Sequence, residues 1–220
     1  MRFIFVQNYG YVKDVKALFF DMDSKKCILK LNYDKIHNIW IGNTTKTVNR
    51  YKYILNDCVR INDYNAKMYE IDDKNEVWTV NKECQSDNVE KDIAISKHGI
   101  VSDNLKEYDL RANYSVFGNK KIFRYETILA NVKGIHSETI MVHQPDGRLY
   151  SFEEIPIITS LNDYYEIETA TKINLFKMEQ SYLYGVWQIK VYIDGKYMLT
   201  DYMLINEEIT KKMIIIDKTI

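Results

Sequence analysis

Short stretches in which apolar and polar side chains alternate constrain this chain more than any other feature. In the segment RYKYILNDCVRI, residues 50–61, Tyr51 and Tyr53 fall on one side of an extended chain and Lys52 on the other. This period of two is typical of a β-strand with one buried face. The Asn-Asp pair at residues 56–57 tolerates the positive φ of a tight turn, after which the alternation resumes. The segment therefore predicts a β-hairpin.

Similar segments recur along the whole chain with turn residues between them, and none has a convincing helical period. The clearest hairpin is 187–205, in which Asp194-Gly195 supplies the turn. Residues 206–212 suit at most two helical turns, and the apolar tail beyond them suits either a docked strand or an exposed end. The other expected strands are 15–20, 27–31, 37–41, 76–80, 111–117, 121–131, 139–143, 148–152 and 169–178. This spacing predicts an all-β protein made of antiparallel β-sandwiches.

The 220 residues are enough for two domains of about 100 residues each. We expect an early-set-like sandwich over residues 1–84, a packed linker over 85–104, and an immunoglobulin-like sandwich with a C-terminal tail over 105–220. The predicted cores hold Leu18, Phe20, Ile28, Trp40, Tyr53, Leu55 and Trp78 in the first domain, and Tyr125, Ile140, Trp187, Ile189 and Val191 in the second.

The segment between the two predicted domains is poor in glycine, serine and proline and contains apolar runs. A flexible tether has neither feature. We therefore expect the segment to pack along the domain boundary, with Ile93, Ile95, Ile100 and Val101 buried between the two sandwiches.

Charge and cysteine content limit the possible partners and compartment. The net charge of −1 predicts no attraction to nucleic acid or to an anionic membrane. Cys27, Cys58 and Cys84 have no paired spacing, which is typical of free thiols in a reducing compartment. No run of 18 apolar residues is present, and the N-terminal apolar run is too short for a signal peptide. We expect a cytoplasmic protein.

No motif predicts catalysis, a metal or a cofactor. Asp21 and Asp23 form an Asp-x-Asp pattern like that of haloacid-dehalogenase-type phosphotransferases, but Ser24 follows where that chemistry needs Gly-Thr, so we predict a solvated hairpin turn. The four histidines are scattered, and the aspartates near the central hairpin match no calcium loop. The sequence therefore predicts a protein that is not an enzyme and has no cofactor.

The order of five short sequence segments in the first 80 residues resembles that in a known family. The segments are Trp40, Tyr51-Lys52-Tyr53-Ile54, Asn56-Asp57, Asn62-Asp63-Tyr64-Asn65-Ala66 and Val77-Trp78-Thr79-Val80. In this order they resemble the family-48 carbohydrate-binding modules, early-set β-sandwiches found in glycogen-branching and debranching enzymes and in AMP-activated kinase β subunits. The resemblance covers a third of the chain. It departs from the family at Tyr64, where proline is usual, and at the family's two platform tryptophans, whose positions carry none here.

The resemblance implies a binding protein that contacts an α-glucan such as glycogen or starch through its first domain. The implied contact residues are Trp40, Arg60, Asn62 and Tyr64. The alternative is a protein–protein interaction or scaffold protein that has lost the sugar site. The tyrosines around the central hairpin leave the same choice open, because they suit either a stacking surface or half-buried sheet positions.

Overall fold

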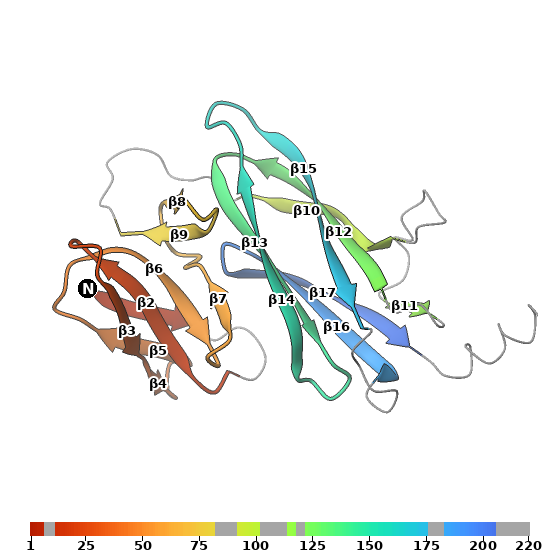
Figure 1. Ribbon diagram of the computed structural model, residues 1–220, viewed down its shortest axis with the longest axis horizontal. Coiled ribbons are helices and arrows are strands. Elements are labelled where there is room, and N and C mark those ends of the chain that lie inside the picture. Colours follow the sequence, from red (N-terminus) through yellow and green to blue (C-terminus); the bar gives the residue numbers. More distant parts are fainter. Residues whose placement is uncertain (7–11, 82–91, 102–113, 118–121, 176–182, 206–220) are drawn as a thin grey trace, which may run out of the picture.

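The computed structural model describes residues 1–6, 12–81, 92–101, 114–117, 122–175 and 183–205. All seventeen elements of this described part are strands, so the all-β prediction is confirmed. The strands form four sheets, which stack in pairs into two sandwiches that lie side by side, the first in red to yellow and the second in green to blue (Figure 1). Among these described residues, no helix is long and apolar enough to cross a membrane.

The first sandwich packs a three-stranded sheet against a six-stranded one. The small sheet has the order β1-β5-β4, and the large sheet has the order β3-β2-β6-β9-β8 with β7 paired to β6. Their bounds are β1 Arg2–Val6, β2 Val15–Asp21, β3 Lys26–Lys30, β4 Asn32–Asp34, β5 Ile39–Asn43, β6 Val48–Leu55, β7 Val59–Ile61, β8 Tyr69–Ile71 and β9 Val77–Val80.

The core of the first sandwich follows the alternation of the central hairpin. Tyr51 and Tyr53 of β6 point into the core, where both rings lie within 6.5 Å of the Phe3 ring. Trp40 enters the same core from the small sheet. The predicted turn at Asn56-Asp57 has positive φ at both residues, 51° and 59°. The hairpin prediction for β6 and β7 is therefore confirmed.

The second sandwich packs a three-stranded sheet, β10-β12-β15, against a five-stranded one, β11-β17-β16-β13-β14. All its pairings are antiparallel except that of β11 with β17. The bounds are β10 Ala94–Val101, β11 Tyr114–Phe117, β12 Ile122–Val132, β13 Ile135–His143, β14 Leu149–Ile158, β15 Tyr165–Asn174, β16 Gly185–Ile193 and β17 Lys196–Ile205.

Its core has Trp187 at the centre. The Trp187 side chain is fully buried, and its indole N–H donates to the Leu183 carbonyl oxygen over 2.8 Å, which satisfies the polar atom of the ring. The five core residues predicted for this sandwich, Tyr125, Ile140, Trp187, Ile189 and Val191, are all buried.

Two core predictions in the first sandwich were wrong. Ile28 is 60% exposed, because it lies on the outward side of the edge strand β3, whereas Cys27 and Leu29 of the same strand pack against the core. Phe20 is half-buried, while its neighbour Phe19 enters the core, because β2 turns the opposite set of side chains inward. Leu18 shares the outward side with Phe20 and is buried outside the main core cluster.

The linker prediction also needs correction. Ala94–Val101 is strand β10 of the second sandwich and pairs with β12, so most of the expected linker that the structure describes belongs to a sheet. Ile100 packs into the core around Trp187, and Ile93 packs with Leu129 and Val132 of β12. These side chains therefore stabilise the second sandwich rather than fill a gap between the two. Strand β1 was not predicted at all.

The two sandwiches meet where the β16–β17 turn and the outer face of β13 and β14 reach the first sandwich. Met141 and Tyr192, from the second sandwich, belong to the same buried apolar cluster as the core of the first. Gly195, in the turn, approaches Asn62 so closely that an added Cβ would lie 2.1 Å from the Asn62 carbonyl oxygen. Close packing of this kind favours one relative orientation of the two sandwiches.

A buried ion pair crosses the same boundary. Lys52 lies on the outward side of β6, yet its side chain is 0% exposed because the second sandwich covers it. Its Nζ lies 2.5 Å from Oε2 of Glu154 on β14 and 5.2 Å from the centre of the Trp78 ring. Buried charges are tolerated in proteins when they are paired and hydrogen-bonded, so the position of Lys52 depends on the second sandwich.

Candidate functional site

The structure does not bring the four predicted glucan contacts together on one exposed surface. Trp40 is 7% exposed and packs in the core, so its ring has no free face for a sugar. Asn62 is buried, and the Arg60 guanidinium lies 3.4 Å from the Glu76 carboxylate. Tyr64 is the exception at 37% exposed, with the Lys196 ammonium 5.4 Å from its ring centre.

Asn62 instead bridges the two sandwiches. Its side-chain N–H₂ donates to Ser137 Oγ over 2.9 Å and to Glu154 Oε1 over 3.2 Å, both in the second sandwich. Its side-chain oxygen accepts from Thr79 Oγ1 over 3.1 Å. With its amide used in this way, Asn62 has a structural role at the boundary.

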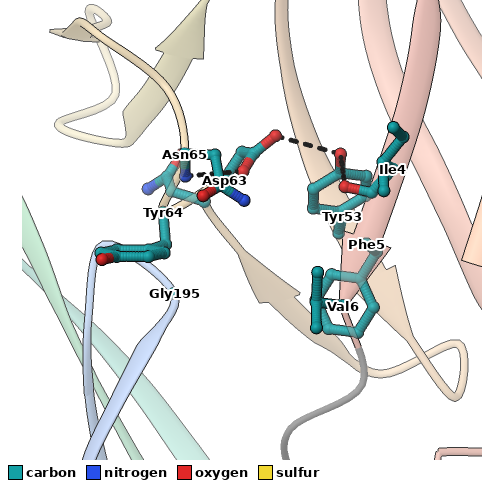
Figure 2. A pocket seen from close by; sticks show the side chains of 9 residues that line it. Ile4, Phe5, Val6, Tyr53, Asp63, Tyr64, Asn65 and Gly195 are labelled. Carbon is teal, nitrogen blue, oxygen red and sulfur yellow. Dashed lines mark hydrogen bonds between the residues drawn. The ribbon is translucent and has the colours of Figure 1, made fainter. Parts of the chain in front are cut away.

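A small hollow lies beside Tyr64, between the first sandwich and the β16–β17 turn (Figure 2). Its polar centre is the Asp63 carboxylate, which accepts from the Tyr51 hydroxyl over 2.8 Å and lies 3.1 Å from the Tyr53 hydroxyl. Burial is the main cause that raises the pKa of both phenols. The volume is about 100 Å³, below the roughly 300–1,000 Å³ of ordinary ligand pockets, so it suits no sizeable small molecule.

The Asp-x-Asp motif forms a hairpin turn, as predicted. Asp21 ends β2, and its carboxylate accepts from the Lys25 backbone N–H over 2.9 Å. The Lys46 ammonium lies 3.2 Å from the same carboxylate and 3.0 Å from the Cys27 sulfur. Backbone and lysine hydrogen bonds hold the pKa of Asp21 below its usual value. Cys27 and Cys58 are free thiols, and Cys84 lies outside the described residues.

Histidine–aspartate pairs occur in the second sandwich, and one of them also includes a tyrosine. Asp201 of β17 accepts from the Tyr125 hydroxyl over 2.7 Å, and its carboxylate lies 2.7 Å from Nδ1 of His98. The hydrogen bond to Asp201 raises the pKa of His98. In the part of the chain that the structure describes, no group of three or more His, Cys, Asp or Glu side chains is arranged to hold a metal ion.

A more extended surface is the outer face of the five-stranded sheet of the second sandwich. We call the part that the first sandwich leaves open the tyrosine face. Its two tyrosines, Tyr197 and Tyr202, are each 40% exposed, and Val186 is 46% exposed. The tyrosine face consists of Val186, Gln188, Lys190, Tyr197, Thr200 and Tyr202.

The strand register arranges these side chains in rows across the sheet. Tyr202 pairs with Gln188, Thr200 pairs with Lys190, and Tyr197 pairs with the covered Tyr192. The row of Lys190 therefore lies between the rows of the two exposed tyrosines. Rows on one face are two residues apart along a strand, about 7 Å, so the two tyrosines are separated by about 13 Å.

Two ionisable groups set the electrostatics of this face. Lys190 is half-buried, and burial lowers its pKa. No carboxylate contributes to that shift. His143, in the row of Tyr202 and Gln188, has its pKa lowered to about 4, first by burial and then by the charge of Lys190. At neutral pH His143 is therefore uncharged, and Lys190 is the cation of the face.

The tyrosine face was missed at the level of sequence, although its signal is present. In the hairpin 187–205, the alternation predicts that Trp187, Ile189 and Val191 are buried, and the side chains between them lie on the opposite side. That side carries Lys190 and, across the turn, the two exposed tyrosines. Nothing in a single sequence says which part of a polar side another domain will cover.

Comparisons with known proteins give only distant likenesses. No family model matches this sequence, and no curated protein matches it. Among solved structures, the chain is similar to a CARDB domain from Pyrococcus furiosus crystallised with di-metal ions, at 14% identity and a TM-score of 0.30, over 52% of this chain and 88% of that one. It is similar to an immunoglobulin-like protein from Pseudomonas aeruginosa, at 11% identity and a TM-score of 0.33, over 54% of this chain and 99% of that one.

A β-glucuronidase from Bacteroides uniformis is a third similar structure, at 10% identity and a TM-score of 0.34. The match covers 92% of this chain and 26% of the enzyme. Likenesses this low carry no conclusion about function, and none of these three is a family-48 carbohydrate-binding module. The description of this protein as a pair of β-sandwiches rests on its own sheets.

Proposed function

We propose that this chain is a non-catalytic binding protein that recognises a protein partner through the tyrosine face. The observation that supports it is the exposure of Tyr197 and Tyr202 on the outer face of a sheet. Tyrosine is enriched in protein interfaces because its ring offers a large contact area at a low cost in rotamer entropy. The outer face of a sheet suits a macromolecule, because small molecules are mostly bound in clefts.

The absence of catalysis is part of the proposal. The carboxylates near the two candidate surfaces already have structural partners, since Asp63 binds tyrosine hydroxyls and Glu154 binds Lys52. Acid–base chemistry needs a group that can reach a substrate proton, and neither carboxylate is available for that.

Binding of an α-glucan through the first sandwich is the second candidate, and Tyr64 is the observation that favours it. Its exposed ring could stack on a sugar. The buried Trp40 and Asn62 give this candidate less support than the tyrosine face has. A native gel containing glycogen tests it directly: retardation that Tyr64→Ala removes would favour glucan binding over the protein partner.

Comparative capture from an extract of the protein's own cell tests the first candidate. Wild type is compared with Tyr202→Ser and with a matched control, Tyr164→Ser, whose ring is 53% exposed on the β14–β15 connection of the same sandwich. We expect a protein enriched by wild type and by the control but lost with Tyr202→Ser. Equal capture by all three would refute a role for the tyrosine face.

A further inference from the structure

We infer that the partner presents a carboxylate side chain to Lys190, between the two exposed tyrosines. This inference rests on the proposed function and names the chemistry of the partner. Lys190 lies in the middle row of the tyrosine face, with Tyr202 in the row on one side and Tyr197 in the row on the other.

Among the described residues, Lys190 is a half-buried cation without a carboxylate partner. No ion pair joins Lys190 to any carboxylate of the described residues, and burial alone lowers its pKa. A half-buried charge without a counter-charge is unfavourable, and an incoming carboxylate would relieve that cost. Ion pairs gain strength when surrounding rings exclude water, and the two tyrosines are placed to do so.

The groups packed around Lys190 offer no competing negative charge. On β13 its cross-strand neighbour is Met141, and His143 lies in the next row, uncharged at neutral pH. On β17 its neighbour is Thr200, whose hydroxyl lies 2.8 Å from that of Tyr197. The nearby Asp201 points to the inner side, where it binds Tyr125.

An acidic polysaccharide could also bring a carboxylate, but the rest of the face favours a protein. Beyond Tyr202, the next row of the face pairs Val186 with Leu204. Val186 is exposed, so the face ends in an aliphatic patch. Aliphatic contact is supplied by amino-acid side chains and not by sugar hydroxyls, so the mixed face fits an acidic protein segment.

Selection from a displayed random-peptide library on the full chain tests the inference. We expect enriched peptides to carry Asp or Glu beside apolar residues, and Lys190→Gln to weaken their binding about tenfold, as the loss of one well-shielded ion pair should. Lys190→Glu should reverse the preference, so that the same selection enriches Lys or Arg. Lys172→Glu, at an exposed position of β15, is the matched control and should leave the preference unchanged.

The outcomes separate the inference from the proposed function. Peptides that need Tyr202 but carry no acidic residue would refute the acidic partner and leave the tyrosine face as a protein-binding surface. Peptides that bind equally to Tyr202→Ser and Lys190→Gln, or no enrichment at all, would overturn both. Binding of polygalacturonate to wild type but not to Lys190→Gln, without any acidic peptide, would replace the protein by a polysaccharide.

Discussion

Replacing Gly195 by alanine tests how tightly the two sandwiches are joined. Gly195 has a φ of +87° in the β16–β17 turn, and an added Cβ would lie 2.1 Å from the carbonyl oxygen of Asn62 in the first sandwich. Gly147 is the matched control, because its φ of +86° is almost the same and an added Cβ there meets nothing within 4 Å. The two substitutions share the backbone strain and differ in the clash.

The expected magnitudes follow from these two contributions. An alanine at such a positive φ costs about 1–2 kcal/mol of unfolding free energy, and this should be the whole effect at Gly147. At Gly195 the clash with backbone atoms adds about 1–3 kcal/mol, because neither side can move freely. Gly195→Ala should therefore destabilise the protein by about 2–5 kcal/mol in total.

Urea unfolding of the three proteins provides the measurement. The free energies of unfolding are compared with one common m-value, the slope of the unfolding free energy against urea concentration. Tryptophan fluorescence and far-UV circular dichroism are independent probes. We expect one coincident transition in wild type and a larger loss for Gly195→Ala than for Gly147→Ala. Equal losses in the two variants would show that the turn does not press against the first sandwich and would refute the fixed orientation.

Three further predictions concern buried ionisable groups. Glu154→Ala leaves Lys52 buried without a partner and should cost about 3 kcal/mol in a urea titration, whereas a loss below about 0.5 kcal/mol would contradict the buried pair. Burial raises the pKa of Glu138, so the contribution of Glu138 to stability is present below its unfolded pKa and is lost as the pH rises through its folded pKa. The stability of Glu138→Gln should therefore increase relative to that of wild type from pH 5 to 8. A stability difference that does not change with pH would argue against this. The pKa of His143 is lowered to about 4, so the contribution of His143 to stability is present above its unfolded pKa of about 6.5 and is lost as the pH falls through about 4. Proton NMR should give a titration midpoint near 4 for the His143 ring, and Lys190→Gln should raise that midpoint. A midpoint near 6.5 in wild type would contradict the burial of the ring.

Local pattern predicted much of the fold because a half-buried strand needs one apolar side. Tyr53, Trp187 and Ile189 are core residues for this reason, and the Asp194-Gly195 pair forms the expected turn. The same reasoning was wrong for Ile28, since alternation does not tell which side of an edge strand faces the core.

Contacts between distant parts of the chain could not be predicted from the sequence. Lys52 looks like a solvated lysine in its own strand, and only Glu154, 102 residues away, makes its burial possible. Likewise, the apolar residues of β10 were assigned to the domain boundary because nothing local shows that β12 is their partner. The resemblance placed Trp40 and Asn62 in a sugar site, and the structure instead buries both side chains.

Site-specific photo-crosslinking in the cell tests the proposed function most directly. A photoreactive phenylalanine analogue replaces Tyr202 on the tyrosine face or Tyr164 at the control position. We expect a discrete cross-linked protein from position 202, carrying acidic residues at the site of linkage, and no such product from position 164. The same product from both positions, or one from position 164 alone, would contradict the assignment of this face as the binding surface.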